Sequence, residues 1–206
     1  MARYRQLILG ELSTNCYVVW DENSRETLVI DPADSAEIIG DFLLQNKLEL
    51  KLICLTHGHF DHVMAAVELK LNFGTLIGMS MEDEFLWKRQ TKTARHFTGG
   101  EFLKLGEMTK IDVDFDKTNS FKLGGEIIEV IRLPGHTPGS VGFYVAGEGW
   151  LFSGDVVFEE GVGTAEYGYG DKDKLEESID KIKKLPKETL VLPGHGEGFY
   201  LAALTQ

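Results

Sequence analysis

Short apolar runs alternate with amphipathic stretches along the chain. Each run is rich in Val, Ile, Leu and Phe and is bounded by Gly, Pro, Asp or Asn, which is typical of strands buried in a core. The runs predict strands over residues 3–9, 15–20, 27–30, 50–55, 75–78, 121–123, 126–133, 139–146, 150–153 and 189–192.

The stretches between these strands show helical spacing. Apolar side chains recur at intervals of three and four in residues 35–46, 61–72 and 173–185. Ser80 opens a further helix, which we expect to end near Thr91, because the sequence from Ser80 to Asp83 resembles a capping box. Residues 92–120 show no clear period and are interpreted as an insertion beside a site.

The order of these elements indicates the fold class. Strands come early in pairs, helices are interspersed, and strands and a helix recur late in the chain. This order predicts an α/β layered domain with two sheets inside and helices outside. The length of 206 residues suits one domain, so we expect residues 1–206 to form a single unit.

Charge and composition exclude several classes of protein. No apolar run approaches the ~20 residues of a membrane span, and the N-terminus is not followed by a long apolar stretch. The net charge of −12 disfavours nucleic acid as a partner. Cys16 and Cys54 lie in apolar runs, which predicts buried free thiols. We therefore expect a cytoplasmic protein that acts on a small molecule, and a homo-oligomer stays open.

Five of the six histidines fall in three tight clusters, and each cluster directly follows a predicted strand. A single aspartate, Asp155, follows another strand in the same way. Because loops after strands carry the chemistry of α/β folds, we expect these side chains to meet. The clusters and the aspartate are THGHFDH at 56–62, LPGHTPG at 133–139, LPGHG at 192–196 and FSGD at 152–155.

The spacing of the first cluster indicates a metal centre. His57 and His59 are two residues apart in an extended loop, so their rings project to the same side. Asp61 and His62 leave the following helix at adjacent angles. Two diverging pairs suit two neighbouring divalent ions, and Asp155 can offer one carboxylate oxygen to each. Imidazole and carboxylate ligands favour Zn²⁺ and also suit Fe or Mn.

One histidine alone is more often a core residue than a ligand, but seven residues of ligand type after strand ends outweigh that interpretation. The motifs resemble the metallo-β-lactamase-fold hydrolase superfamily, and within it the glyoxalase II (hydroxyacylglutathione hydrolase) branch. Weaker matches are Asn15-Cys16-Tyr17 and Val29-Ile30-Asp31-Pro32. The resemblance spans about residues 7–198.

The resemblance implies a four-layer αββα sandwich of two mixed sheets packed face to face, with the site at one edge. It implies a first metal on His57, His59 and His136. It implies a second metal on Asp61, His62 and His195, with Asp155 bridging the two. Asp31 is either an orienting residue behind the histidine loop or an ordinary turn aspartate.

Two features depart from the glyoxalase II branch. Enzymes of that branch carry a C-terminal helical domain that helps to bind glutathione, whereas eleven residues follow His195 here. They also place a basic residue in the loop after the bridging aspartate, where this chain has Thr164. Tyr167 and Tyr169 in the same loop either line the pocket or pack on the surface. For Trp87, His96 and Phe97 we expect ordinary packing.

The sequence thus predicts a dinuclear metal-dependent hydrolase that uses a metal-bound hydroxide on a small thioester, with His57, Asp61 and Asp155 central to catalysis. The alternatives are an Fe(II) persulfide dioxygenase with one iron, and a lactonase or other ester hydrolase on the same fold. The second set of ligands favours two metals over the single-iron alternative. A non-catalytic metal-binding module is disfavoured because the ligand set leaves open coordination positions.

Overall fold

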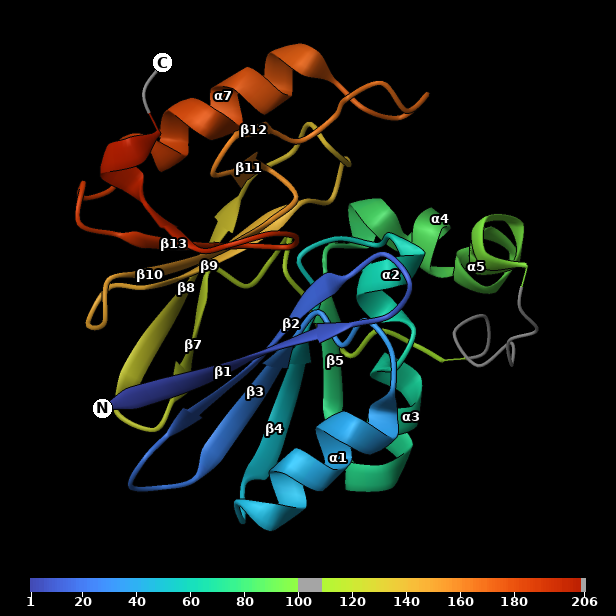
Figure 1. Ribbon diagram of the computed structural model, residues 1–206, viewed down its shortest axis with the longest axis vertical. Coiled ribbons are helices and arrows are strands. Elements are labelled where there is room, and N and C mark those ends of the chain that lie inside the picture. Colours follow the sequence, from blue (N-terminus) through green and yellow to red (C-terminus); the bar gives the residue numbers. More distant parts are fainter. Residues whose placement is uncertain (100–108, 205–206) are drawn as a thin grey trace.

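Two six-stranded sheets form the centre of the computed structural model, which describes residues 1–99 and 109–204 (Figure 1). The first sheet has the order β1-β2-β3-β4-β5-β6 and is antiparallel up to β3 and parallel from β3 to β6. Its strands are β1 (Ala2–Leu9), β2 (Thr14–Asp21), β3 (Glu26–Ile30), β4 (Glu49–Cys54), β5 (Leu76–Met79) and β6 (Val113–Asp114).

The second sheet has the order β14-β13-β10-β9-β8-β7 and is also mixed, because only β10 and β13 are parallel neighbours. Its strands are β7 (Ser120–Leu123), β8 (Glu126–Arg132), β9 (Val141–Val145), β10 (Trp150–Gly154), β13 (Leu190–Pro193) and β14 (Phe199–Tyr200). A small separate hairpin joins β11 (Val157–Phe158) to β12 (Gly161–Val162).

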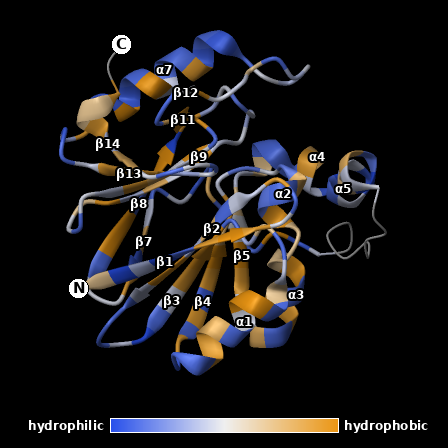
Figure 2. Cartoon of the chain, in the orientation of Figure 1, coloured by the Kyte–Doolittle hydropathy of each residue, from blue (hydrophilic) through white to orange (hydrophobic). Residues whose placement is uncertain are grey.

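Strand β2 shows how the sheets become buried on both faces. Cys16 and Val18 point into an apolar cluster on the outer side of the first sheet, whereas Tyr17 and Val19 point into the cluster between the sheets. Successive strand residues face opposite sides, so an unbroken apolar run serves two cores. Figure 2 shows the resulting apolar colouring along the inner strands of the first sheet.

Helices cover the outer face of each sheet. On the first sheet, α1 (Ala36–Gln45) and α3 (Ala66–Phe73) pack Ile39 and Leu69 against the strands. On the second sheet, α7 (Lys172–Ile182) packs Ile179 in the same way. The layers are therefore helix, sheet, sheet and helix, which confirms the predicted αββα sandwich. Both cysteines are buried free thiols, as predicted.

The prediction of one continuous helix over residues 61–72 is wrong. The chain forms a short α2 (Phe60–Val63), breaks, and resumes as α3. At the break, the N–H of Ala65 donates to the carbonyl oxygen of Pro32 at 3.0 Å, outside the helix. The break separates the two ligand-type residues of α2 from the helix that packs on the sheet.

The helix predicted from Ser80 is also divided. Ser80 does cap its start, because its hydroxyl accepts the N–H of Glu82. The chain then forms η1 (Met81–Asp83), α4 (Glu84–Trp87) and α5 (Gln90–Thr98). Trp87 is buried where α4 ends, and its indole N–H donates to the carbonyl oxygen of Thr109 at 3.0 Å.

The segment 92–120 was expected to be an insertion, but its described residues beyond 108 complete the first sheet. Strand β6 pairs with β5, and Phe115 is buried between the two sheets. Residues 100–108 lie outside the described residues. The short strands β6, β11, β12 and β14 were not predicted, because two residues give no alternation. Among the described residues, no helix has the length and apolarity needed to cross a membrane.

Candidate metal centre

The loops that carry the ligand-type residues converge because their strands run in the same direction. Strands β3 and β4 are parallel in the first sheet, β10 and β13 are parallel in the second, and β8 has the direction of β10. The ligating atoms form a first group of three histidines and a second group around Asp61, and a third set with Asp155 overlaps both. Together they contain every candidate ligand predicted from the sequence: His57, His59, Asp61, His62, His136, Asp155 and His195.

The first group consists of three imidazoles. The Nε2 atom of His57 lies 3.0 Å from Nδ1 of His59, and the Nε2 atom of His136 lies 3.1 Å from the same Nδ1 atom. His57 and His136 are buried and His59 is partly buried. Three ring nitrogens thus face one point, which is the donor set that Zn²⁺ and iron accept from histidine.

Oxygen atoms fix the opposite nitrogen of each of these rings. Such contacts select the tautomer and hold the plane of a metal-binding imidazole. The outer partners are Thr56 Oγ1 at 3.0 Å from His57 Nδ1, the Tyr169 hydroxyl at 2.8 Å from His59 Nε2, and the Thr164 carbonyl oxygen at 2.7 Å from His136 Nδ1.

The second group combines imidazole with carboxylate. The Oδ2 atom of Asp61 lies 3.5 Å from Nε2 of His62 and 3.4 Å from Nε2 of His195. Asp155 stands between the groups: Oδ1 is 3.5 Å from His62 Nε2, and Oδ2 is 3.6 Å from His195 Nε2. The same Oδ2 lies 3.7 Å from Nε2 of His136, so one carboxylate faces both groups.

Asp31 contacts His62 of the second group directly and reaches His57 of the first group through Thr56. Its Oδ2 lies 3.0 Å from His62 Nδ1, and its two oxygens accept the N–H and the hydroxyl of Thr56 at 2.8 and 2.7 Å. Asp31 is buried and has a positive φ of 49°, which turns the chain sharply at the end of β3. These contacts support the interpretation of Asp31 as an orienting residue rather than a simple turn residue.

Strand β2 of the first sheet anchors the loop of His195. The side-chain amide of Asn15 donates to the carbonyl oxygens of Pro193 and Gly196, and the Tyr17 hydroxyl donates to that of Pro193 at 2.7 Å. These bonds explain the Asn15-Cys16-Tyr17 match. Gly194 is required here because a Cβ would lie 2.1 Å from Asp155 Oδ1.

Electrostatics separates the two groups. Burial, with the neighbouring histidines, lowers the pKa of His57 well below its usual value and that of His59 to about 3. Burial also opposes the charged form of His62, but the surrounding carboxylates outweigh it and raise the pKa of His62 well above its usual value. The pKa of His195 is raised by Asp61 and Asp155 against the same effect of burial.

Unpaired buried atoms test whether the residues fit a metal. Among the described residues, Nε2 of His62 and Oδ1 of Asp155 are buried without a hydrogen-bond partner. Such atoms are costly unless something charged or polar binds them. Together with the convergent nitrogens, they show that the site can hold divalent metal ions.

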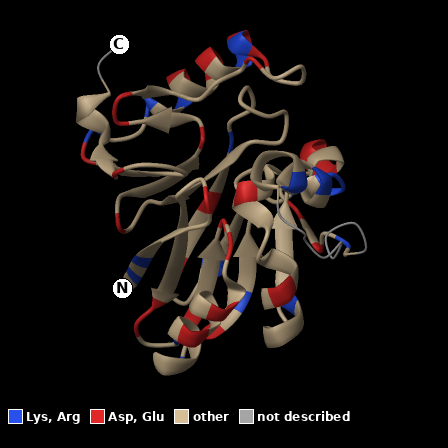
Figure 3. Ribbon diagram, turned by 45° about the vertical axis from the view of Figure 1, so that its right-hand side comes forward, with Lys and Arg blue, Asp and Glu red and all other residues tan. Residues whose placement is uncertain are grey.

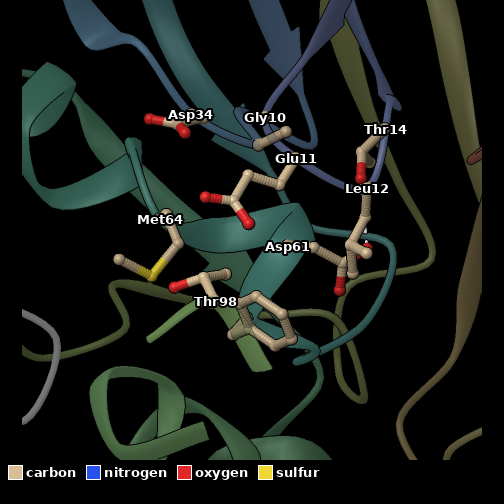
Figure 4. A pocket seen from close by; sticks show the side chains of 10 residues that line it. Gly10, Glu11, Leu12, Thr14, Asp34, Asp61, Met64 and Thr98 are labelled. Atoms are coloured by element: carbon tan, nitrogen blue, oxygen red, sulfur yellow. Dashed lines mark hydrogen bonds between the residues drawn. The ribbon is translucent and has the colours of Figure 1, made fainter. Parts of the chain in front are cut away.

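Two surfaces flank the candidate ligands. On one side, Leu12, Phe60 and Met64 give apolar walls to a hollow that reaches Asp61, and Figure 4 shows the Glu11 side chain extending between Met64 and Asp61. Thr14 donates to Asp61 from this side at 3.1 Å.

On the other side, the ring of Tyr167 lies 5.1 Å from that of His59, and the Tyr167 and Tyr169 rings stack at 5.4 Å. Both tyrosines therefore line the site. Trp87 is core packing, and Phe97 stacks on Phe60.

Sequence reasoning missed one residue beside the centre, Asp83. Its buried carboxylate accepts the N–H groups of Gly58 and Gly139 and the hydroxyl of Thr137. Its burial raises the pKa of the carboxyl group despite these bonds. Asp83 was assigned to a helix start, and no motif connects it to residues so distant in the sequence.

A family model described as the metallo-beta-lactamase superfamily matches residues 9–195. The chain belongs to the metallo-β-lactamase superfamily. Hydroxyacylglutathione hydrolase GloC of Haemophilus influenzae is 35% identical over 191 residues, covering 88% of this chain and 85% of that protein. These similarities support a metal-dependent hydrolase.

Solved structures of the superfamily agree with this assignment. The B3 metallo-beta-lactamase BLEG-1 has a TM-score of 0.88 and 30% identity, covering 98% of this chain and 95% of that one. The protein TTHA1623, solved in a di-iron-bound form, has a TM-score of 0.85 and 31% identity, covering 97% and 96%.

Proposed function

We propose that this member of the superfamily is a dinuclear metal-dependent hydrolase of small hydroxyacyl thioesters. The observation that carries the proposal is the position of Asp155, whose carboxylate faces both groups of ligands. One ion would be held by His57, His59 and His136, and the other by Asp61, His62 and His195. The similarity to a protein named hydroxyacylglutathione hydrolase supports the thioester class.

Two divalent ions in such a site lower the pKa of a bound water to near neutrality and polarise a carbonyl oxygen. Zn²⁺ fits these ligands, and the di-iron form of TTHA1623 makes iron an equal choice. The chain's own residues position the ligands: Tyr169 and Thr164 hold the rings of His59 and His136, and Asp31 holds His62.

The leaving group explains why no separate acid is required. A thiol has a pKa of about 8.5, so a thiolate departs without receiving a proton first. The buried thiols of Cys16 and Cys54 have raised pKa values, because burial disfavours the thiolate. Neither cysteine is therefore suited to act as a nucleophile.

The test is hydrolysis of S-D-lactoylglutathione by metal-loaded protein, followed as loss of thioester absorbance, with Asp155→Ala as the blank. We expect kcat/KM of at least ~10⁴ M⁻¹s⁻¹ for the wild type. Turnover no faster than the blank would contradict the proposal. A parallel assay with a lactone of similar size separates the ester-hydrolase alternative.

A further inference from the structure

A basic surface lies on α5 and the end of α4, in a chain that is acidic overall. Residues 85–99 contain four Lys or Arg residues and one histidine but no Asp or Glu. Arg89, Lys92, Thr93 and His96 line one hollow on this surface. Figure 3 shows basic residues on these helices, whereas the charged residues of α1 are acidic.

Aromatic rings connect this hollow to the candidate metal centre. The Tyr169 hydroxyl contacts His59, and the Tyr169 ring lies 5.3 Å from the ring of Phe85. The guanidinium carbon of Arg89 lies 5.9 Å from the centre of the Phe85 ring. A continuous row of side-chain contacts therefore runs from the candidate ligand His59 through Tyr169 and Phe85 to Arg89.

The cations of the hollow are available to a ligand. Lys88 is paired with Glu84 on the same helix, but Arg89 and Lys92 form no ion pair within the described residues. Both side chains are exposed. Two exposed cationic side chains next to an aromatic wall form a surface that attracts anions.

We propose that this hollow binds the anionic end of the thiol carrier of the substrate, whether carboxylate or phosphate. The inference rests on the proposed thioester hydrolysis. Arg89 and Lys92 would then provide the positive charge for the carrier that Thr164, in the loop after Asp155, cannot provide. The hollow beside Asp61 is then left for the acyl group.

The test compares Arg89→Ala/Lys92→Ala with wild type on two lactoyl thioesters, one of anionic glutathione and one of neutral N-acetylcysteamine. We expect KM for the glutathione thioester to rise roughly 5- to 10-fold, with KM for the neutral thioester unchanged. Arg5→Ala/Lys122→Ala is the matched control, because it removes the same charge from exposed sites elsewhere. Equal KM changes for both thioesters, or none, would overturn the inference.

A binding measurement separates this inference from the proposed function. Titration calorimetry with S-methylglutathione and with S-methyl-coenzyme A needs no turnover, and it distinguishes a carboxylate carrier from a phosphate carrier. We expect one of them to bind wild type and to lose affinity in Arg89→Ala/Lys92→Ala. If neither binds, or if the variant binds equally well, the hollow is not the anchor, whatever the catalytic result.

Asp83 carries a second, independent inference. Gly58 separates His57 from His59, and Thr137 and Gly139 follow His136 in its loop. The Asp83 carboxylate binds all three at 2.7 to 2.8 Å from within the protein. One carboxylate therefore joins the two loops that supply the first group of ligands.

We infer that Asp83 is a positioning residue for the first metal and not for the second. Two of its three partners are the main-chain N–H groups of Gly58 and Gly139, and neither N–H has another acceptor among the described residues. A Cβ on Gly139 would lie 2.6 Å from the Asp83 carboxyl carbon, so the loop is shaped around this side chain. Asp61, His62 and His195 form no hydrogen bond with it.

The test is metal affinity, measured by competition with a chromophoric chelator. Asp83→Asn should lower the affinity for one of the two ions by roughly 10- to 100-fold and leave the affinity for the other unchanged. Asp116→Asn is the matched control, because Asp116 caps the neighbouring turn through Ser80 and Met81 without touching a histidine loop.

If Asp83→Asn does not fold, Thr137→Val removes one of the three bonds and should show the same selective loss to a smaller extent. Unchanged affinity for both ions, or equal weakening of both, would overturn the inference. A wild-type protein that binds a single ion would instead contradict the dinuclear proposal, and Asp83 would then be judged on that ion.

Discussion

The two ligand groups at the sheet edge are built from different chemistry. The first consists of three histidines whose outer partners are neutral oxygens. The second combines histidines with Asp61, and Asp31 contacts His62 from behind. The pKa values of His57 and His59 are lowered, whereas those of His62 and His195 are raised.

This difference shows what each group needs. Because their pKa values are lowered, the imidazoles of His57 and His59 present lone pairs to a cation without first losing a proton. The raised pKa values of His62 and His195 favour protons on these rings, so a metal must compete with protons at the second group. Asp155 is the one candidate ligand whose carboxylate faces histidines of both groups, so the largest effects should follow from changing it.

Asp155→Ala should weaken metal binding at both groups and so remove the distinction between them. It takes away the oxygen that faces His62 and the oxygen that faces His136. We expect loss of both ions and a fall in activity larger than the roughly 10- to 100-fold typical of an outer contact. Elemental analysis after dialysis measures this, with circular dichroism to show retained fold. Full metal content in the variant would contradict the bridging role.

Asp31→Asn should sharpen the comparison by acting mainly on the second group. An amide cannot accept hydrogen bonds from both Thr56 and His62 as the carboxylate does, so His62 is held less firmly in its orientation. We expect a roughly 10- to 100-fold loss of affinity for the second ion and a smaller change for the first. Asp21→Asn serves as the control, because Asp21 is a buried carboxylate at the end of β2 that accepts the N–H groups of Asn23 and Ser24. Equal loss of both ions would assign Asp31 to the fold instead.

Acidification should release the second ion before the first. The raised pKa values of His62 and His195 mean that protons compete with metal at this group as soon as the pH falls. The lowered pKa values of His57 and His59 keep these two rings of the first group unprotonated to lower pH. Metal content measured by equilibrium dialysis between about pH 8 and pH 4 should therefore fall in two steps. One joint step, or earlier loss from the first group, would contradict this.

The candidate ligands could be predicted from the sequence because their information is local. His57, His59 and Asp61 lie within one short motif, and each motif directly follows a clear apolar run. The contacts that position the ligands are not local. Asp83 binds groups 25 and 56 residues away, and no spacing rule reports such a pair. The break between α2 and α3 was missed for the same reason, because it depends on Pro32 in another loop.

Tyr169→Phe should produce the smallest effect and test the outer partners of the first group. The change removes only the hydroxyl at 2.8 Å from His59 Nε2 and keeps the ring against Phe85. Because His59 keeps its ring packing, we expect at most about a 10-fold loss of affinity for the first ion, with the second unchanged. Tyr144→Phe, a buried tyrosine in the apolar cluster beneath α7, should change neither. If Tyr169→Phe lowers the affinity for the second ion instead, the hydroxyl does not act through His59, and the two groups are not independent at this position.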